Sequence, residues 1–111
     1  MRNISFALTT PQFLAGNKTV TRRMGWKFLK AGDRLMAIEK GQGLKKGEKV
    51  KRLGEIEVVS VSRERLNQIG RSDVCWEGFM GWEPSEFVSF FCRANGCQPS
   101  DWVTRIQFKR I

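Results

Sequence analysis

Apolar and polar residues alternate with a period of two in several short segments of the chain, which is typical of half-buried β-strands. In the first segment, Ile4, Phe6 and Leu8 share one face, and the residues between them are polar or small. Another extended, β-branched segment follows residue 18. Further strands are predicted on the same basis at residues 34–39, 50–61 and 103–108, and the first covers residues 2–8.

A short helical turn is predicted between the first two extended segments. Thr10 is suited to cap a turn over residues 10–14, with Pro11 at the first helical position and Gly16 at the exit. Another helical turn is expected around Leu66, in the connection after the longest strand.

Two helices are predicted in the last third of the chain. Ser72 and Asp73 are expected to cap a short helix from residue 74 to about residue 78. A longer helix opens at residues 83–86 and closes at the Asn-Gly pair 95–96. Its apolar residues recur at the spacing i, i+3, i+4, i+7 and are expected to lie in the core: Phe87, Phe90, Phe91 and Ala94.

The longest β-like segment has two distinct faces. Ile56 and Val58 are expected on one face, and Val59 and Val61 on the other. Gly54 suggests a β-bulge, which small barrels use to curve a sheet. Together, the order strand-helix-strand-strand-strand-helix-helix-strand and these glycine-interrupted strands predict a small α+β barrel.

Length and composition favour one folded domain over residues 1–111. The chain is 41% hydrophobic and has only three prolines, which argues against disorder. No apolar run approaches the ~20 residues that cross a bilayer. The N-terminus does not resemble a signal peptide, so a cytoplasmic protein without membrane contact is expected. No feature of the sequence specifies an oligomeric state.

The cysteine and histidine content restricts the possible chemistry. Three cysteines cannot form a complete disulfide framework, and free thiols are expected. Cys92 and Cys97 form a poor zinc site because the chain has no histidine, so neither a metal nor another cofactor is expected. The absence of histidine also excludes Ser-His-Asp and Cys-His catalysis. Acid-base chemistry must therefore use Lys, Glu, Asp or Cys.

Positive charge is concentrated in one third of the chain. Residues 18–52 hold twelve Lys or Arg against three Asp or Glu, which accounts for the whole net charge of +9. Such a field attracts polyanions, among which nucleic acid is the most common in cells. The alternative is a basic surface that only aids solubility. The Gly- and Lys-rich residues 41–49 do not end in Gly-Lys-Ser/Thr, and they are expected to form a hairpin connection whose lysines 45, 46 and 49 contact phosphates.

Residues 16–23 (Gly-Asn-Lys-Thr-Val-Thr-Arg-Arg) combine a flexible turn with several reactive side chains. In a regular strand Lys18 and Thr21 would face opposite sides, so they converge only if the chain still turns at residues 16–18. Composition alone favours a solvated turn that leads into an edge strand.

The same residues resemble the signature of ASCH domains, small β-barrels of the PUA-like superfamily. Gly16, Lys18 and Thr21 match the motif, and either Arg22 or Arg23 corresponds to its arginine. Residues 30–35 (Lys-Ala-Gly-Asp-Arg-Leu) resemble the Gly-Asp block that follows in the family, and residues 77–79 (Glu-Gly-Phe) before a helix resemble a third block. The resemblance implies a small PUA-like (ASCH) β-barrel with short flanking helices.

Some bacterial ASCH proteins are amidohydrolases that remove the acetyl group from N4-acetylcytidine. The resemblance therefore implies a catalytic set of Lys18, Thr21 and Glu77. Lys18 would take the proton of Thr21, the Thr21 hydroxyl would attack the amide carbonyl, and Glu77 would protonate the leaving amine. In a variant, Lys18 and Glu77 activate water and Thr21 positions the substrate. Arg22 or Arg23 would stabilise the oxyanion or hold a phosphate.

Two other functions are compatible with the sequence. The basic segment at residues 40–52 is longer and more positive than a single-nucleoside pocket requires, which favours RNA as a partner. The protein would then be an RNA-binding module without catalysis, or a metal-independent ribonuclease that uses the same pocket. Trp26 would either pack over the mouth of the barrel or stack on a base, and Glu77 would be an ordinary surface residue if no catalysis occurs.

Overall fold

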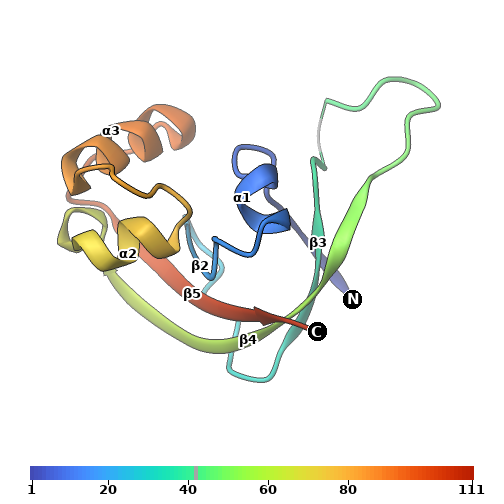
Figure 1. Cartoon of the computed structure of the whole chain (residues 1–111), viewed down its shortest axis with the longest axis horizontal. Helices are drawn as coiled ribbons and strands as arrows, with labels where there is room; N and C mark the ends of the chain where they lie inside the picture. Colours follow the sequence, from blue (N-terminus) through green and yellow to red (C-terminus); the bar gives the residue numbers. More distant parts are fainter. Residues whose placement is uncertain (42) are drawn as a thin grey trace.

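The computed structural model describes residues 1–41 and 43–111, and these form a strongly curled mixed sheet with three short helices (Figure 1). The strands are β1 (Arg2–Ser5), β2 (Val20–Arg23), β3 (Arg34–Ile38), β4 (Arg52–Arg65) and β5 (Trp102–Arg110). The helices are α1 (Thr10–Leu14), α2 (Arg71–Trp76) and α3 (Pro84–Asn95), with a 3-10 turn, η1, at Leu66–Gln68. The predicted order of elements and the α+β class are confirmed.

The described strands are ordered β1-β3-β4-β5-β2, so that β1 and β2 form the two edges. β1 runs parallel to β3, and the other neighbouring pairs are antiparallel. β4 is long enough to pair with β3 through its first half and with β5 through most of its length. The sheet curls into a half-barrel, with α1 over its hollow side and α2 and α3 together at one end (Figure 1).

Two register shifts in β4 produce much of this curl. Ala37 pairs with Gly54, whose φ is 143°, and the next pair skips one residue of β4, as expected for a bulge at this glycine. A second shift lies at Val59, between the pairs of Val58 and Ser60. Because this bulge resets the alternation, Val61 packs against the core while Val59 is exposed, so the prediction that these two valines share a face was wrong.

The buried apolar residues form two clusters. The first fills the space between the sheet and α1, and it includes Phe6, Phe13, Ile56, Ile106 and Phe108. Phe6 and Phe13 stack with their ring centroids 4.9 Å apart. The second cluster lies under α2 and α3 and includes Leu66, Val74, Phe79, Phe87, Phe91 and Val103.

Several predicted boundaries differ from the structure. β1 ends at Ser5, and Leu8 is exposed in the turn that follows, so its predicted inward position was wrong. α2 begins at Arg71 with Gly70 as its N-cap, which places Ser72 and Asp73 inside the first turn and not before it. α3 begins and ends where predicted, with Pro84 in its first turn and Gly96 in a left-handed conformation after its last residue.

No helix in the described ranges is both long and apolar enough to cross a membrane. The three cysteines are free and half-buried, as expected.

Candidate active site

A cavity of about 780 Å³ opens beside β2. The wall includes residues of β1 and of the turn after it, residues of β2, and Glu77 and Phe79 directly after α2. Residues of α3 and of both ends of the connection between β3 and β4 also contribute. Segments that lie far apart in the sequence therefore meet around one volume, and Lys18, Thr21 and Glu77 all line it.

Lys18 and Glu77 form a buried ion pair at this cavity. The Lys18 ammonium nitrogen, Nζ, lies 2.7 Å from Glu77 Oε1 and 2.9 Å from the backbone carbonyl oxygen of the same residue. Both side chains are about 3% exposed. Lys18 thus donates two hydrogen bonds to a single residue, which fixes the position of its terminal nitrogen.

The chain is still turning at Lys18, which explains how this residue and Thr21 reach the same cavity. Asn17 N and Lys18 N both donate to the carbonyl oxygen of Gln12 in α1, and the regular strand begins only at Val20. Thr19 N donates to the carbonyl oxygen of Trp76 at 2.8 Å, and this bond ties the turn to the end of α2. Gly16, Asn17 and Thr19 are exposed and β2 is an edge strand, so the expected solvated turn before an edge strand is present, but Lys18 within it is buried.

Gly78 allows the end of α2 to approach α1 closely. Its φ is +104°, and a Cβ atom at this position would lie 2.8 Å from Cβ of Gln12 and 3.6 Å from Cβ of Lys18. A glycine is therefore required directly after Glu77 for the Lys18–Glu77 contact to form without displacement of the backbone.

Burial lowers the pKa of Lys18 from its ordinary value of 10.5. The carboxylate of Glu77 acts in the opposite direction, while the charges of Arg23 and Arg22 lower the pKa further. The Lys18 ammonium also lies 5.8 Å from the centroid of the Phe6 ring. Lys18 is consequently easier to deprotonate than an exposed lysine, in the direction that general-base chemistry requires.

Thr21 is 3% exposed and lines the same cavity. Its hydroxyl has no hydrogen bond to another described residue. Every buried side-chain oxygen in the described chain has a hydrogen-bond partner, so the Thr21 hydroxyl is not among the buried ones. The Thr21 hydroxyl therefore lies at the cavity surface, and it is not hydrogen-bonded to Lys18.

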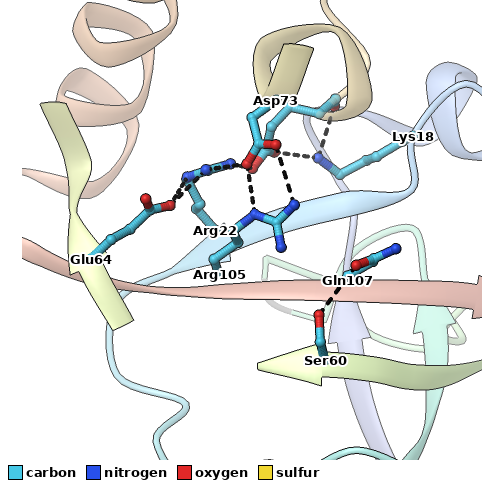
Figure 2. A network of polar contacts seen from close by, with 8 residues as sticks. Lys18, Arg22, Ser60, Glu64, Asp73, Arg105 and Gln107 are labelled. Carbon is cyan, nitrogen blue, oxygen red and sulfur yellow. Dashed lines mark hydrogen bonds and ion pairs between the residues drawn. The ribbon is translucent and has the colours of Figure 1, made fainter. Parts of the chain in front are cut away.

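Arg22 also lines the cavity, and it lies at the centre of a network of carboxylates (Figure 2). It donates to Glu77 Oε2 at 3.0 Å and to Glu64 Oε1 at 2.6 and 3.0 Å, and it also pairs with Asp73. Asp73 in turn accepts hydrogen bonds from Arg105 at 2.6 and 3.2 Å. Burial alone would lower the pKa of Arg22, but its carboxylate partners outweigh burial and raise it. Arg22 therefore fixes the Glu77 carboxylate through Oε2, while Lys18 binds Oε1.

Arg23 faces the cavity without a comparable set of partners. Its Nη2 donates to the carbonyl oxygen of Ser5 at 2.5 Å, and its guanidinium lies 5.4 Å from the Phe6 ring centroid. Of the two adjacent arginines, Arg23 is the one whose charge remains directed at the cavity.

Trp26 is half-buried at the cavity wall and also packs against the first apolar cluster. Its φ is +53°, the one positive φ of a described non-glycine residue, and its ring centroid lies 5.4 Å from that of Phe28. Trp26 therefore packs over the cavity as one of the two alternatives predicted, and stacking on a base stays a prediction.

The structure separates the predicted lysines from the cavity. Lys45, Lys46 and Lys49 are exposed in the β3–β4 connection and do not line it, whereas Lys40 and Val50 at the ends of the connection do. Residue 42 of the predicted hairpin connection lies outside the described residues.

Sequence reasoning missed the contribution of α3. Phe87, Phe90, Phe91 and Ala94 line the cavity, although the stripe was predicted to be core. Phe87 and Phe91 are buried, but Phe90 is half-buried and Ala94 is exposed, so that part of the prediction was wrong. The spacing of a stripe identifies one face of a helix, and it does not distinguish a core from the wall of a cavity.

In the described chain, no group of three or more His, Cys, Asp or Glu is arranged to hold a metal ion. The acidic residues nearest the cavity are instead occupied by arginine and lysine.

No protein-family model and no curated protein matches the sequence. Solved structures do match. A DUF984-family protein of Enterococcus faecalis has a TM-score of 0.66 at 17% identity, over 94% of this chain and 70% of that one.

Two other solved structures carry the ASCH name. The ASCH domain of Lactobacillus crispatus has a TM-score of 0.66 at 15% identity, over 98% of this chain and 79% of that one. A mutant ASCH protein of Zymomonas mobilis has a TM-score of 0.62 at 14% identity, over 96% of this chain and 67% of that one. At these identities the similarity concerns the fold alone, and the chain has an ASCH-like α+β fold.

Proposed function

We propose that the protein is a metal-independent amidohydrolase that removes the acetyl group from N4-acetylcytidine-type substrates. The observation that carries this proposal is the buried Lys18–Glu77 pair, which lines the same large cavity as the unpartnered hydroxyl of Thr21. The three residue types needed for acid-base and nucleophilic chemistry without histidine are therefore adjacent to one space.

The hydrogen bonds at Lys18 suit the role of a base. A neutral amine has two N–H groups and one lone pair, and both N–H groups are accounted for by the bonds to Glu77. The lone pair is then available to accept a proton. The lowered pKa of Lys18 supports the neutral form.

In the proposed reaction, Lys18 accepts the hydroxyl proton of Thr21 as the Thr21 oxygen attacks the acetyl carbonyl. The C–N bond then breaks, and the proton passes through Glu77 to the exocyclic amine of the departing cytidine. Water then attacks the acetyl ester on Thr21 while the Lys18–Glu77 pair takes one of its protons, the ester C–O bond breaks, and the pair returns that proton to the Thr21 oxygen. Acetic acid leaves and ionises to acetate in solvent. In the variant mechanism, the same pair activates water directly and Thr21 only positions the amide.

The two mechanisms differ in the need for the Thr21 hydroxyl. Replacement of Thr21 by Ser retains a nucleophile, whereas Thr21→Val retains the shape and removes it. Loss of turnover in Thr21→Val with retention in Thr21→Ser supports the acyl-enzyme route, and activity in both supports direct attack by water.

The proposed activity is tested by absorbance-monitored hydrolysis of N4-acetylcytidine. Wild type is compared with Lys18→Ala and with the matched control Lys109→Ala, which removes an exposed lysine on β5. We expect turnover by wild type and by the control and none by Lys18→Ala. Absence of turnover by folded wild type contradicts the proposal.

The exposed lysines favour a second candidate, RNA binding or cleavage. Lys45, Lys46 and Lys49 have no described ion-pair partner, and their connection borders the cavity through Lys40 and Val50. A polyanion on this connection would reach the rim of the cavity at Lys40 and Val50. RNA affinity that depends on salt and on these three lysines, without turnover of the nucleoside, would favour this candidate.

A further inference from the structure

Arg23 is a half-buried cation in the cavity wall to which the proposed reaction assigns no role. No carboxylate of the described chain lies within ion-pair distance of it, and its one described hydrogen bond goes to the carbonyl oxygen of Ser5. The adjacent Arg22, in contrast, pairs with three carboxylates. Arg22 is therefore neutralised by neighbouring carboxylates, whereas the consecutive residue Arg23 has no carboxylate partner in the described chain.

Removal of a cation from water without a counter-charge is costly. Burial lowers the pKa of Arg23 to about 10, even though the charge of Glu77 acts in the other direction. A guanidinium has five N–H groups, and one of those on Arg23 is bonded within the described chain. Because no buried side-chain nitrogen of the described chain lacks a partner, the remaining N–H groups of Arg23 reach the open cavity.

The surroundings of Arg23 extend this positive region. Lys40 lines the same cavity, and its one described ion pair, with Glu48, is exposed and 3.7 Å long. Asn3 of the edge strand β1 adds an amide to the wall, whereas the Ser5 hydroxyl already donates to the carbonyl oxygen of Glu39 at 3.2 Å. Glu77 is the one carboxylate in the described wall, and Lys18 and Arg22 already neutralise it. This part of the cavity thus offers cationic donors and no competing anion.

We propose that Arg23, assisted by Lys40, forms a phosphate subsite, and that a phosphorylated nucleoside is a better substrate than the free nucleoside. The identity of the base rests on the proposed function. A guanidinium presents parallel N–H groups that match two oxygens of one phosphate group. The phosphate belongs either to a mononucleotide or to a nucleotide unit within RNA, and both present the same chemistry to Arg23.

The size of the cavity is consistent with this substrate class. Ligand pockets for small molecules range over roughly 300–1,000 Å³. A cavity of about 780 Å³ has room for a base at the Lys18–Glu77 pair together with a sugar and a phosphate.

Calorimetric titration tests the subsite without requiring turnover. The probes are cytidine, cytidine 5′-monophosphate, cytidine 3′-monophosphate and the dinucleotide CpC, each titrated into wild type and Arg23→Gln. Arg71→Gln is the matched control, because the Arg71 side chain is 76% exposed at the start of α2 and lies outside both the cavity wall and the basic segment. We expect wild type and the control to bind a phosphorylated probe at least about tenfold more tightly than cytidine, since a charge-assisted hydrogen bond contributes about 1.5–3 kcal/mol.

Arg23→Gln should lose this preference and retain its affinity for cytidine, while Arg23→Lys should recover part of it. Tighter binding of a monophosphate assigns the subsite to a mononucleotide, and tighter binding of CpC assigns it to RNA; both outcomes support the proposal. Equal binding of cytidine and all phosphorylated probes by wild type overturns it, and this comparison needs no variant. A preference that persists in folded Arg23→Gln also overturns it.

The outcomes for the subsite and for the proposed function are separate. Wild type that prefers the phosphorylated probes but does not hydrolyse N4-acetylcytidine or its monophosphate retains the subsite and loses the amidohydrolase function. Wild type that hydrolyses N4-acetylcytidine and binds all probes equally retains the function and loses the subsite.

Discussion

Two regions of this protein lie within the same basic third of the sequence, residues 18–52, and they differ in the surroundings of their charged side chains. In β2 and the turn before it, Arg22 and Lys18 are buried against carboxylates. In the β3–β4 connection, Lys45, Lys46 and Lys49 are exposed to solvent. The charge count of the sequence does not distinguish the two regions, but the structure does.

The difference shows that a buried charged side chain is held in one position by its oppositely charged partners. The network at the cavity contains three cations, Lys18, Arg22 and Arg105, and three carboxylates, Glu64, Asp73 and Glu77. Each group is held by bonds from at least one other, so its position is fixed (Figure 2). Exposed lysines are free to move and are screened by salt, so they suit non-specific attraction of a polyanion.

The largest expected effect concerns Glu77. We expect Glu77→Gln to lower kcat/KM for N4-acetylcytidine by about 10³-fold, because the variant keeps the shape of the side chain and loses its proton transfer. RNA affinity should be unchanged or raised, since one negative charge is removed. Steady-state kinetics and filter binding measure the two effects. Equal losses of activity and RNA affinity would show that Glu77 does not act in a separate catalytic region.

The next effect concerns the stability of the network. Arg22→Ala leaves Glu64, Asp73 and Glu77 with one fewer cation, and it should lower the free energy of unfolding by about 3–5 kcal/mol. Chemical denaturation measures this change, and the exposed Arg52→Ala serves as its control. A cost as small as that of the control would mean that Arg22 does not hold the network together.

Gly78 tests the close approach that places Glu77. Gly78→Ala introduces both a left-handed alanine and a contact of 2.8 Å with Gln12. Gly81→Ala is matched to it, because Gly81 has a φ of +85° and no atom within 4 Å of the added Cβ. We expect the control to cost about 1–2 kcal/mol from backbone strain, and Gly78→Ala to cost more and also to reduce turnover. Similar stability and full activity in the two variants would contradict the packing argument.

The pH dependence follows from the lowered pKa of Lys18. If the neutral amine is the base, kcat/KM should rise up to tenfold per pH unit below the folded pKa and level off before the ordinary value of 10.5. Folded Lys18 releases its proton before unfolded Lys18 does, so its contribution to the free energy of unfolding also rises with pH toward 10.5. Rate profiles and thermal denaturation of wild type and Lys18→Met measure both. A rate that falls over this interval would exclude Lys18 as the base.

The smallest effect on nucleoside turnover is expected from the exposed region. Replacement of Lys45, Lys46 and Lys49 by Gln should change kcat/KM for N4-acetylcytidine by less than about twofold, because exposed charges are screened. The same triple variant should bind RNA more weakly, with a shallower dependence of affinity on salt. Salt titrations of RNA binding provide the measurement. An unchanged salt dependence would remove these lysines from any RNA interface.

Local patterns were sufficient to predict most of the fold. Alternation, the Pro11 and Pro84 positions and the glycines at helix ends depend on neighbouring residues, and the order of elements was correct. The exceptions arise where tertiary structure overrides a local period. The bulge at Val59 shifts Val61 to the inner face, and β1 ends before the alternation of the sequence does.

The candidate site was predictable only in part. The family resemblance selected Lys18, Thr21 and Glu77, which the structure places around one cavity, and their roles remain a proposal. Nothing in the sequence indicated that Arg22 would pair with Glu64 and Asp73, which are 42 and 51 residues away. Such pairs depend on how β4 and α2 pack against β2, and no spacing rule describes them.

The most direct test compares wild type, Glu77→Gln and the triple Gln variant of Lys45, Lys46 and Lys49 in one N4-acetylcytidine hydrolysis assay. If the chemistry lies in the buried region, the triple variant turns over at the wild-type rate and Glu77→Gln falls to the background rate. Loss of turnover in the triple variant with retention in Glu77→Gln, or absence of turnover by folded wild type, would contradict this account.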